Sequence, residues 1–244
     1  MKNTHVYFAI PTRGNDLYWR LVVYLLEQKA AFSKMSLGFA INGWQASTED
    51  LFQHIISSDA EYIQWIDADI GPASGTTQQL VERDVDIITA PVWMYDPKTN
   101  DIHLNVLSDF KRESRMYRPK RSGIEQVAQC SFSMLLISRN VIDAFRRAGE
   151  SFCKWSPFIH KSWQVMPPDV IFCRKAQKLG LKIFVDWEVK PAEHHKYVSL
   201  SENTVEQFFV NRIKDIDELK GHTGTLGSEN GRHGRERFPV LAEH

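Results

Sequence analysis

Two aspartates that follow an apolar run have the type and spacing to bind a metal ion. Asp67 and Asp69 come directly after the β-prone run 62–66 and just before Gly71. Residues i and i+2 of an extended strand point to the same side, so we expect both carboxylates to reach one cation. That place is the carboxyl edge of the sheet, where open α/β folds bind ligands. Hard oxygen ligands suit Mg²⁺ or Mn²⁺, ions that commonly carry nucleotide phosphates. The alternative is an acidic turn after a buried strand, since Asp is a common turn residue.

Two other places in the sequence carry candidate site residues, one at the end of a predicted strand and one at the start of a predicted helix. Pro11, Thr12 and Arg13 end the first apolar run, where backbone groups and the arginine are placed to hold a nucleotide base or phosphate. Asp169 follows two prolines at a predicted helix start, so its carboxylate is oriented and accessible. The alternative role of Asp169 is helix capping, which contributes ~0.5–2 kcal/mol.

A histidine pair follows the last predicted strand. His194 and His195 carry imidazoles able to complete the shell of a divalent metal. The alternative, a solvated pair of loop residues, stays open.

The elements that must position these residues alternate between strands and helices. Strands that alternate with helices imply parallel crossover units in an α/β fold. Ser47 or Thr48 is expected to cap the second helix. After Pro91 the pattern loosens, and residues 93–123 are expected to form a long loop. Predicted strands span 6–10, 37–41, 62–66, 85–90, 127–129, 133–138 and 182–185; predicted helices span 16–31, 48–58, 74–82, 139–148, 169–179 and 205–219.

Composition limits the classes of function. The chain has 244 residues, 43% hydrophobic and 25% charged, and its formal net charge is zero, so no overall field draws it to nucleic acid or membrane. Its three cysteines are far apart in sequence, which argues against a disulfide framework and a structural zinc site. The chain shows neither a signal peptide nor an apolar run of ~18 residues. We therefore expect a cytoplasmic protein without a membrane span, with one domain at 1–220 and a flexible tail at 221–244.

In their order and spacing, these motifs resemble the GT-A glycosyltransferases, specifically the family 2-like branch common in bacteria and phages. The resemblance runs from about residue 5 to residue 197. It implies a GT-A-like (Rossmann-like) fold, a mostly parallel sheet flanked by helices. In that family the Asp-x-Asp motif, matched by Asp67 and Asp69, holds Mn²⁺ or Mg²⁺ on the diphosphate of a sugar nucleotide. The run 169–174 matches the helix start whose Asp169 is the general base of inverting transfer.

The family's later histidine, often a metal ligand, falls on His194 or His195, and we favour His194. Two departures matter. Pro168 replaces an acidic residue that helps to bind the acceptor, and the segment after Asp186 is about one residue longer than the family's pattern.

The resemblance implies a hexosyltransferase that moves a sugar from a nucleotide donor, expected to be a UDP-sugar, to a hydroxyl of a saccharide or other acceptor. One alternative is a DNA-modifying glycosyltransferase acting on a hydroxylated base. Another is a catalytically weak nucleotide-sugar-binding protein, since Pro168 breaks the acidic pair. The residues expected to bind the nucleotide are Pro11, Thr12, Arg13, Asn42, Asp67 and Ala68.

The irregular segments contain further candidates for ligand contacts. Residues 111–121 hold six basic residues and one acid, which suits a solvated loop, a lid over the diphosphate, or a contact to a polyanion such as DNA. Trp93, Trp155 and Trp163 have faces that stack on sugar rings or bases, although core packing explains most tryptophans.

Overall fold

The computed structural model describes residues 4–12, 17–40, 44–96, 100–108, 122–152, 167–195 and 199–200. The chain divides into two units, Met1–Val205 and Glu206–His244, and all described residues belong to the first. The predicted helix 205–219, the domain boundary at 220 and the tail 221–244 lie outside the described residues, so they stay predictions.

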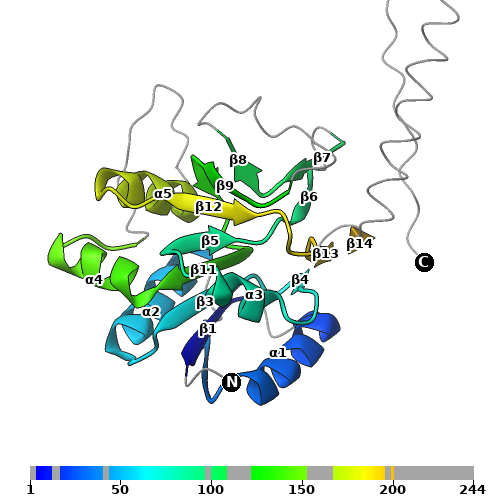
Figure 1. The fold of residues 1–244 in the computed structure, drawn as a ribbon, viewed down its shortest axis with the longest axis horizontal. Helices are drawn as coiled ribbons and strands as arrows, with labels where there is room; N and C mark the ends of the chain where they lie inside the picture. Colours follow the sequence, from blue (N-terminus) through cyan, green and yellow to red (C-terminus); the bar gives the residue numbers. More distant parts are fainter. Residues whose placement is uncertain are drawn as a thin grey trace, which may run out of the picture. The chain divides into compact units, whose positions relative to one another are not determined.

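A seven-stranded sheet is the centre of the described fold, with the strand order β2-β1-β3-β11-β5-β12-β9. Five of these strands run parallel to one another, whereas β11 and β9 run in the opposite direction. Figure 1 shows the sheet edge-on between its helices. The strands are β1 (His5–Pro11), β2 (Lys34–Ala40), β3 (Tyr62–Ile66), β5 (Ile87–Thr89), β9 (Ile124–Val127), β11 (Met134–Ser138) and β12 (Ile183–Asp186).

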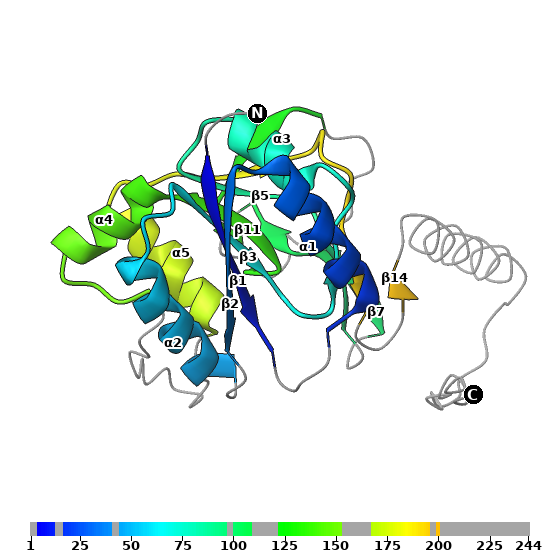
Figure 2. The same cartoon turned by 90° about the horizontal axis from the view of Figure 1, so that it is seen from below.

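Helices cover both faces of this sheet. In Figure 2, α1 and α3 lie on one side, and α2, α4 and α5 lie on the other. The predicted fold class, an α/β GT-A-like sheet that is mostly parallel and flanked by helices, is confirmed. The helices are α1 (Trp19–Ala31), α2 (Trp44–Ser57), α3 (Thr76–Glu82), α4 (Arg139–Arg147) and α5 (Pro168–Lys178).

Each face of the sheet has its own core, because side chains alternate along a strand. Ile66 of β3 packs on the α1 side with Phe8 and Leu21. Trp65, its neighbour in the chain, stacks instead on Phe132 at 5.1 Å between ring centroids. Phe132 continues into an aromatic cluster that packs α2, α4 and α5 on the sheet. The other rings of this cluster are Phe52, Phe145, Phe152 and Phe172.

Short strand pairs extend the fold beyond the central sheet. In the described residues they form a three-stranded sheet and two two-stranded ones. None of the helices in the described ranges is long and apolar enough to span a bilayer. The short strands are β4 (Ile70–Gly71), β13 (Glu193–His195) and β14 (Ser199–Leu200); β6 (Trp93–Asp96) and β7 (Asp101–Leu104); β8 (Val106–Leu107) and β10 (Gln129–Cys130).

The predicted starts of two helices were wrong. Helix α1 begins at Trp19 rather than at Asp16, and α2 begins at Trp44 rather than after a cap at Ser47 or Thr48. Thr48 lies inside α2 and is fully buried. A Ser or Thr marks a helix start only when its hydroxyl caps the first turn, and a buried Thr in mid-helix carries the same local sequence.

The predicted long loop at 93–123 was wrong in its first part, where β6 and β7 form an antiparallel hairpin. Charged residues near the turn of this hairpin made its two β-prone stretches hard to recognise in the sequence. Asn100, with φ 49°, adopts the left-handed conformation that Asn tolerates beside such a turn. Trp93 is only 8% exposed, which favours the core-packing role. Trp155, Trp163 and the basic stretch 111–121 lie outside the described residues.

Candidate functional site

A tight turn holds the two aspartates beyond the end of β3. The N–H of Asp67 donates to the Ser133 carbonyl at 3.3 Å, and the N–H of Ile70 donates to the Asp67 carbonyl at 3.1 Å. The expectation that both aspartates share one extended strand was therefore wrong. They lie in the turn between β3 and β4, at the carboxyl edge of the parallel strands, which is the edge predicted.

Strand β13 brings a histidine to this turn, because it pairs antiparallel with β4 and sets His194 opposite Ile70. The His194 Nε2 atom is 3.6 Å from Asp69 Oδ2, and the imidazole is 4% exposed. The backbone N–H of His195 donates to the Asp69 carbonyl at 2.8 Å. The ring of His195 instead stacks on Tyr18, with centroids 4.6 Å apart. The structure thus places the ring of His194, and not that of His195, against the aspartate.

Asp67 has an unusual electrostatic environment. The Ser133 hydroxyl donates to its Oδ2 at 3.0 Å. Burial raises the pKa of Asp67 to about 7, and the negative charges of Asp69 and Asp169 add to the rise, while the Ser133 hydrogen bond and His194 oppose it. Coulombic interactions of this kind require proximity. The contact between His194 and Asp69, and the turn that joins Asp67 to Asp69, place these three residues in one site, and the charge of Asp169 acts on it.

Asp169 lies in the first turn of α5, where its Oδ1 accepts the backbone N–H of Val170 at 2.8 Å. The helix is fixed from behind, because the Cys173 thiol donates to the Cys130 carbonyl at 3.4 Å. Gln177 donates from the same helix to the Ala128 carbonyl at 2.8 Å. One carboxylate oxygen of Asp169 thus bonds a backbone N–H of the first turn, but the N-cap residue of α5 is Pro167, so Asp169 is not the capping residue. The half-buried group still contributes its charge to the site.

The residues predicted to bind a nucleotide are only partly described. Pro11 and Thr12 are buried at the end of β1, at the same sheet edge as the aspartates, and the N–H of Thr12 donates to the Ala40 carbonyl at 3.0 Å. Ala68 is half-buried, and its carbonyl accepts the N–H of Tyr18 at 2.9 Å. The other two predicted residues, Arg13 and Asn42, lie outside the described residues.

Four residues that support the site were not predicted. Ser133 holds Asp67 from the position just before β11, a strand whose antiparallel insertion has no local sequence signal. Glu193 accepts a hydrogen bond from the Arg20 guanidinium, and the Tyr18 hydroxyl donates to it at 3.5 Å. Glu193 directly precedes the two histidines, so its position was a signal that a carboxylate also reaches this edge.

The donor atoms of the site suit a hard divalent cation. Asp69 and His194 provide an adjacent oxygen and nitrogen, with Asp67 nearby. Within the described residues, no group of three or more His, Cys, Asp or Glu side chains is placed to hold a metal ion, so the protein's contribution here is the Asp69–His194 pair. Such a set fits an ion that keeps most of its positions for water and substrate phosphates, as Mg²⁺ commonly does.

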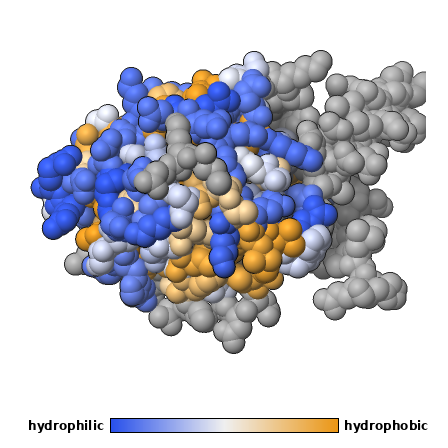
Figure 3. All heavy atoms as spheres, turned by 60° about the horizontal axis from the view of Figure 1, so that its bottom comes forward, coloured by the Kyte–Doolittle hydropathy of each residue, from blue (hydrophilic) through white to orange (hydrophobic). Residues whose placement is uncertain are grey.

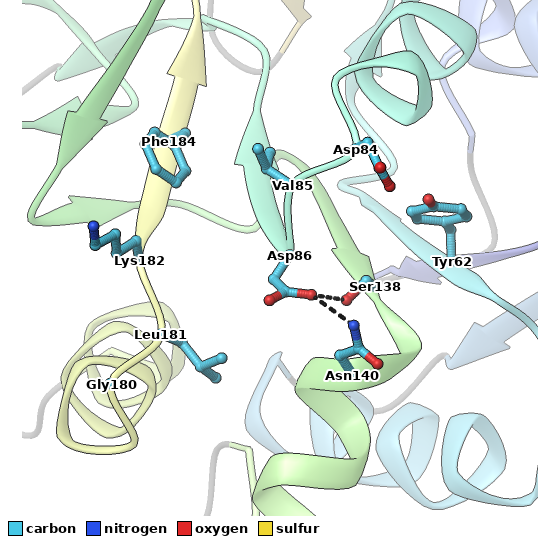
Figure 4. A pocket seen from close by; sticks show the side chains of 10 residues that line it. All are labelled: Tyr62, Asp84, Val85, Asp86, Ser138, Asn140, Gly180, Leu181, Lys182 and Phe184. Carbon is cyan, nitrogen blue, oxygen red and sulfur yellow. Dashed lines mark hydrogen bonds between the residues drawn. The ribbon is translucent and has the colours of Figure 1, made fainter.

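A cavity of about 560 Å³ lies at the opposite edge of the sheet (Figure 4). Tyr62 and Lys182, at the amino ends of parallel strands, line it. Its carboxylate Asp86 accepts hydrogen bonds from Ser138 at 2.5 Å and from Asn140 at 3.2 Å. These groups already bind one another, and the cavity is separate from the aspartate site.

Comparisons with known proteins agree with the fold. No protein-family model matches the chain, and no curated protein matches its sequence. Among solved structures, the chain is similar to A197 from STIV, with a TM-score of 0.54 and 16% identity, over 82% of this chain and 91% of that one. It also matches the catalytic domain of Drosophila beta1,4-galactosyltransferase 7, with a TM-score of 0.44 and 12% identity, over 78% and 67% of the two chains.

A third similar structure is CMP:2-keto-3-deoxy-manno-octonic acid synthetase in complex with CTP. Its TM-score is 0.43 and its identity 10%, over 87% of this chain and 99% of that one. At these identities the likeness concerns the fold, and A197 is the match that carries it.

Proposed function

We propose that this protein is a metal-dependent glycosyltransferase that moves a sugar from a nucleotide donor to an acceptor hydroxyl. The observation that carries the proposal is the approach of His194 Nε2 to Asp69 Oδ2, at 3.6 Å. Two segments more than a hundred residues apart supply this pair, at the sheet edge where ligands bind in such folds.

In the proposed enzyme, Asp69 and His194 would hold Mn²⁺ or Mg²⁺, and Asp67 would support them from the same turn. When bound, the metal neutralises charge that develops on the diphosphate leaving group. Residues of the chain fix the geometry of this proposed metal site. The β4–β13 pairing sets the distance between Asp69 and His194, and Ser133 orients Asp67 by its hydrogen bond. The donor is proposed to be a UDP-sugar, on the resemblance of the motifs.

Asp169 is proposed as the base that accepts the proton of the acceptor hydroxyl. It lies in the first turn of α5, and its charge acts on the carboxylate of Asp67. A base positioned opposite the leaving group favours transfer with inversion. The acceptor is proposed to be a saccharide or another hydroxyl compound.

A nucleotide-sugar-binding protein with weak catalysis is the second candidate, and Pro168 is the observation in its favour. Pro168 is the first residue of α5 and is buried, so it presents no polar group to an acceptor at the position where the resemblance implies an acid. The DNA-modifying alternative depends on the basic stretch 111–121, which lies outside the described residues, and it stays a prediction.

The test is UDP binding and UDP-sugar turnover with and without Mn²⁺, for the wild type and for Asp69→Asn. We expect Mn²⁺-dependent binding of UDP by the wild type in calorimetry, and a loss of affinity of at least about tenfold in the variant, on the scale seen for residues that support metal sites. Asp84→Asn is the matched control, because it removes an exposed carboxylate at the opposite sheet edge.

Binding without turnover of any UDP-sugar would favour the second candidate. Unchanged affinity for UDP and Mn²⁺ in Asp69→Asn, with the control also unchanged, would contradict the proposed site.

A further inference from the structure

Helix α1 carries an exposed apolar stripe in addition to the stripe that packs on the core, although packing on one core requires only one. Each stripe has the i, i+3, i+4, i+7 spacing of residues that share a helix face. The first stripe is buried against the sheet and consists of Leu21, Tyr24 and Leu25, with the polar Gln28 at its end. The second is exposed and consists of Trp19, Val22, Val23 and Leu26.

The exposure of the second stripe is large. Trp19 is 62% exposed and Leu26 is 65% exposed. Figure 3 shows hydrophobic side chains gathered on this face of the molecule. Monomeric proteins rarely expose contiguous apolar patches of this kind without an interaction that covers them.

The edge strand β2 extends the same surface. Leu37 and Phe39 are 48% and 46% exposed. In the parallel register with β1, Leu37 pairs with Phe8, and paired residues point to the same side of a sheet. Because Phe8 packs in the core beneath α1, Leu37 and Phe39 also face the α1 side. The exposed stripe of α1 and these two side chains are called the α1–β2 face below.

The outer side of β2 also offers backbone groups. This strand ends the order of the central sheet, and no strand in the described part of the chain pairs with its outer side. Unpaired N–H and C=O groups on an edge strand are a template for pairing with another strand. The α1–β2 face therefore combines apolar side chains with open strand hydrogen bonding.

We propose that a second copy of this chain covers the α1–β2 face, with β2 paired antiparallel to β2 of the other copy across a two-fold axis. An interface of this symmetry is self-complementary. A register centred on Gly38 sets Leu37 of each copy opposite Phe39 of the other, on the side of α1. The exposed stripes of the two α1 helices, one from each copy, then flank this pair on the same side of the joined sheet.

A lipid surface fits these observations less well. Lipid cannot satisfy the open backbone groups of β2. The formal net charge of zero also gives no overall attraction to anionic headgroups. The exposed apolar surface is on the order of several hundred Å² per copy, which approaches the ~800 Å² per partner of a standard interface.

Sedimentation equilibrium of the full chain, from micromolar to hundreds of micromolar, tests the proposal. We expect a wild-type dimer. The double variant Leu26→Glu, Phe39→Lys should raise the dimer dissociation constant by at least about 100-fold, because charges replace apolar side chains buried between the copies. Both side chains are exposed in the single copy, so circular dichroism and thermal unfolding should stay close to the wild type.

The matched control is Ile124→Lys, which places a charge at a 40% exposed apolar residue of β9, the other edge strand of the sheet. This variant should remain a dimer. A monomeric wild type, with or without binding to neutral or anionic vesicles, would overturn the proposal. So would a folded double variant that dimerises as tightly as the wild type, or a dimer that Ile124→Lys alone dissociates.

Discussion

Four titratable side chains contribute to the candidate site, and three of them lie just beyond a strand or in the first turn of a helix. Asp67 and Asp69 follow β3 and Asp169 lies in the first turn of α5, whereas His194 is the middle residue of the short strand β13. Element ends leave side chains at the surface while the element itself stays rigid, which suits binding and chemistry. The rise of the pKa of Asp67 to about 7 comes first from its burial, and the negative charges of Asp69 and Asp169 add to it.

The variant Asp169→Asn separates a role of Asp169 as general base from a role in stabilising the start of α5. Asn retains an oxygen for the Val170 N–H, so the stability of α5 should change little. If Asp169 is the base of the proposed transfer, the variant should bind the donor normally but lose turnover by about 10²-fold or more. Single-turnover kinetics with a UDP-sugar measures the loss, and calorimetry measures donor affinity. Turnover close to the wild-type rate would leave Asp169 with the role at the start of α5 alone.

At the scale of elements, a buried hydroxyl chain ties α1 to α3 and to the central sheet. The Tyr24 hydroxyl lies 2.5 Å from Thr77 Oγ1 and accepts the Thr77 N–H at 2.9 Å. Thr77 in turn donates to Gln64 of β3 at 3.1 Å. Burial raises the pKa of Tyr24, so the phenol stays protonated and able to donate. This contact keeps α1 in place, and the N-terminus of α1 lies against the aspartate turn through Tyr18 and Ala68.

Tyr24→Phe should therefore destabilise the fold by ~1–3 kcal/mol, because the buried Thr77 N–H loses its acceptor. Urea unfolding measures the change. Tyr95→Phe is the matched control, since that hydroxyl bonds Asn100 at the surface at 2.9 Å and its loss should cost well under 1 kcal/mol. Equal midpoints for the two variants would contradict the structural role given to Tyr24.

At the scale of the whole molecule, one buried histidine predicts how global stability responds to acid. His5 begins β1, with Nε2 2.9 Å from the Ser36 hydroxyl and Nδ1 2.9 Å from Asp59. Burial lowers the pKa of His5, the charge of Lys34 lowers it further, and Asp59 only partly opposes them. The unfolded chain therefore binds a proton at His5 at a higher pH than the folded chain does.

It follows that the contribution of His5 to the free energy of unfolding is greatest above its unfolded pKa, near ~6.5, and is lost as the pH falls below that value. Unfolding by urea at a series of pH values should show a shallower loss of stability on the acid side for His5→Gln than for the wild type. His54→Gln, which removes an exposed imidazole on α2, controls for general titration. A slope for His5→Gln that matches the wild type would show that His5 titrates alike in both states.

The sequence by itself determined most of the local structure. Apolar runs predicted β1, β3 and β12, and the glycines after α4 and α5 end those helices with φ values of 67° and 77°. These features depend on residues within one turn or one strand, so local patterns encode them. The aspartates at the carboxyl edge followed from the same reasoning, because the strand before them is unmistakably apolar.

Only the tertiary structure decided which segments meet. The strand 134–138 is buried on both faces, so its pattern is the same whether it runs parallel or antiparallel, and its insertion between β3 and β5 brings Ser133 to Asp67. The choice of His194 over His195 at Asp69 likewise depends on the register of β13 with β4. A shift of one residue would exchange the two rings between the faces of the strand, and contacts between distant segments set that register.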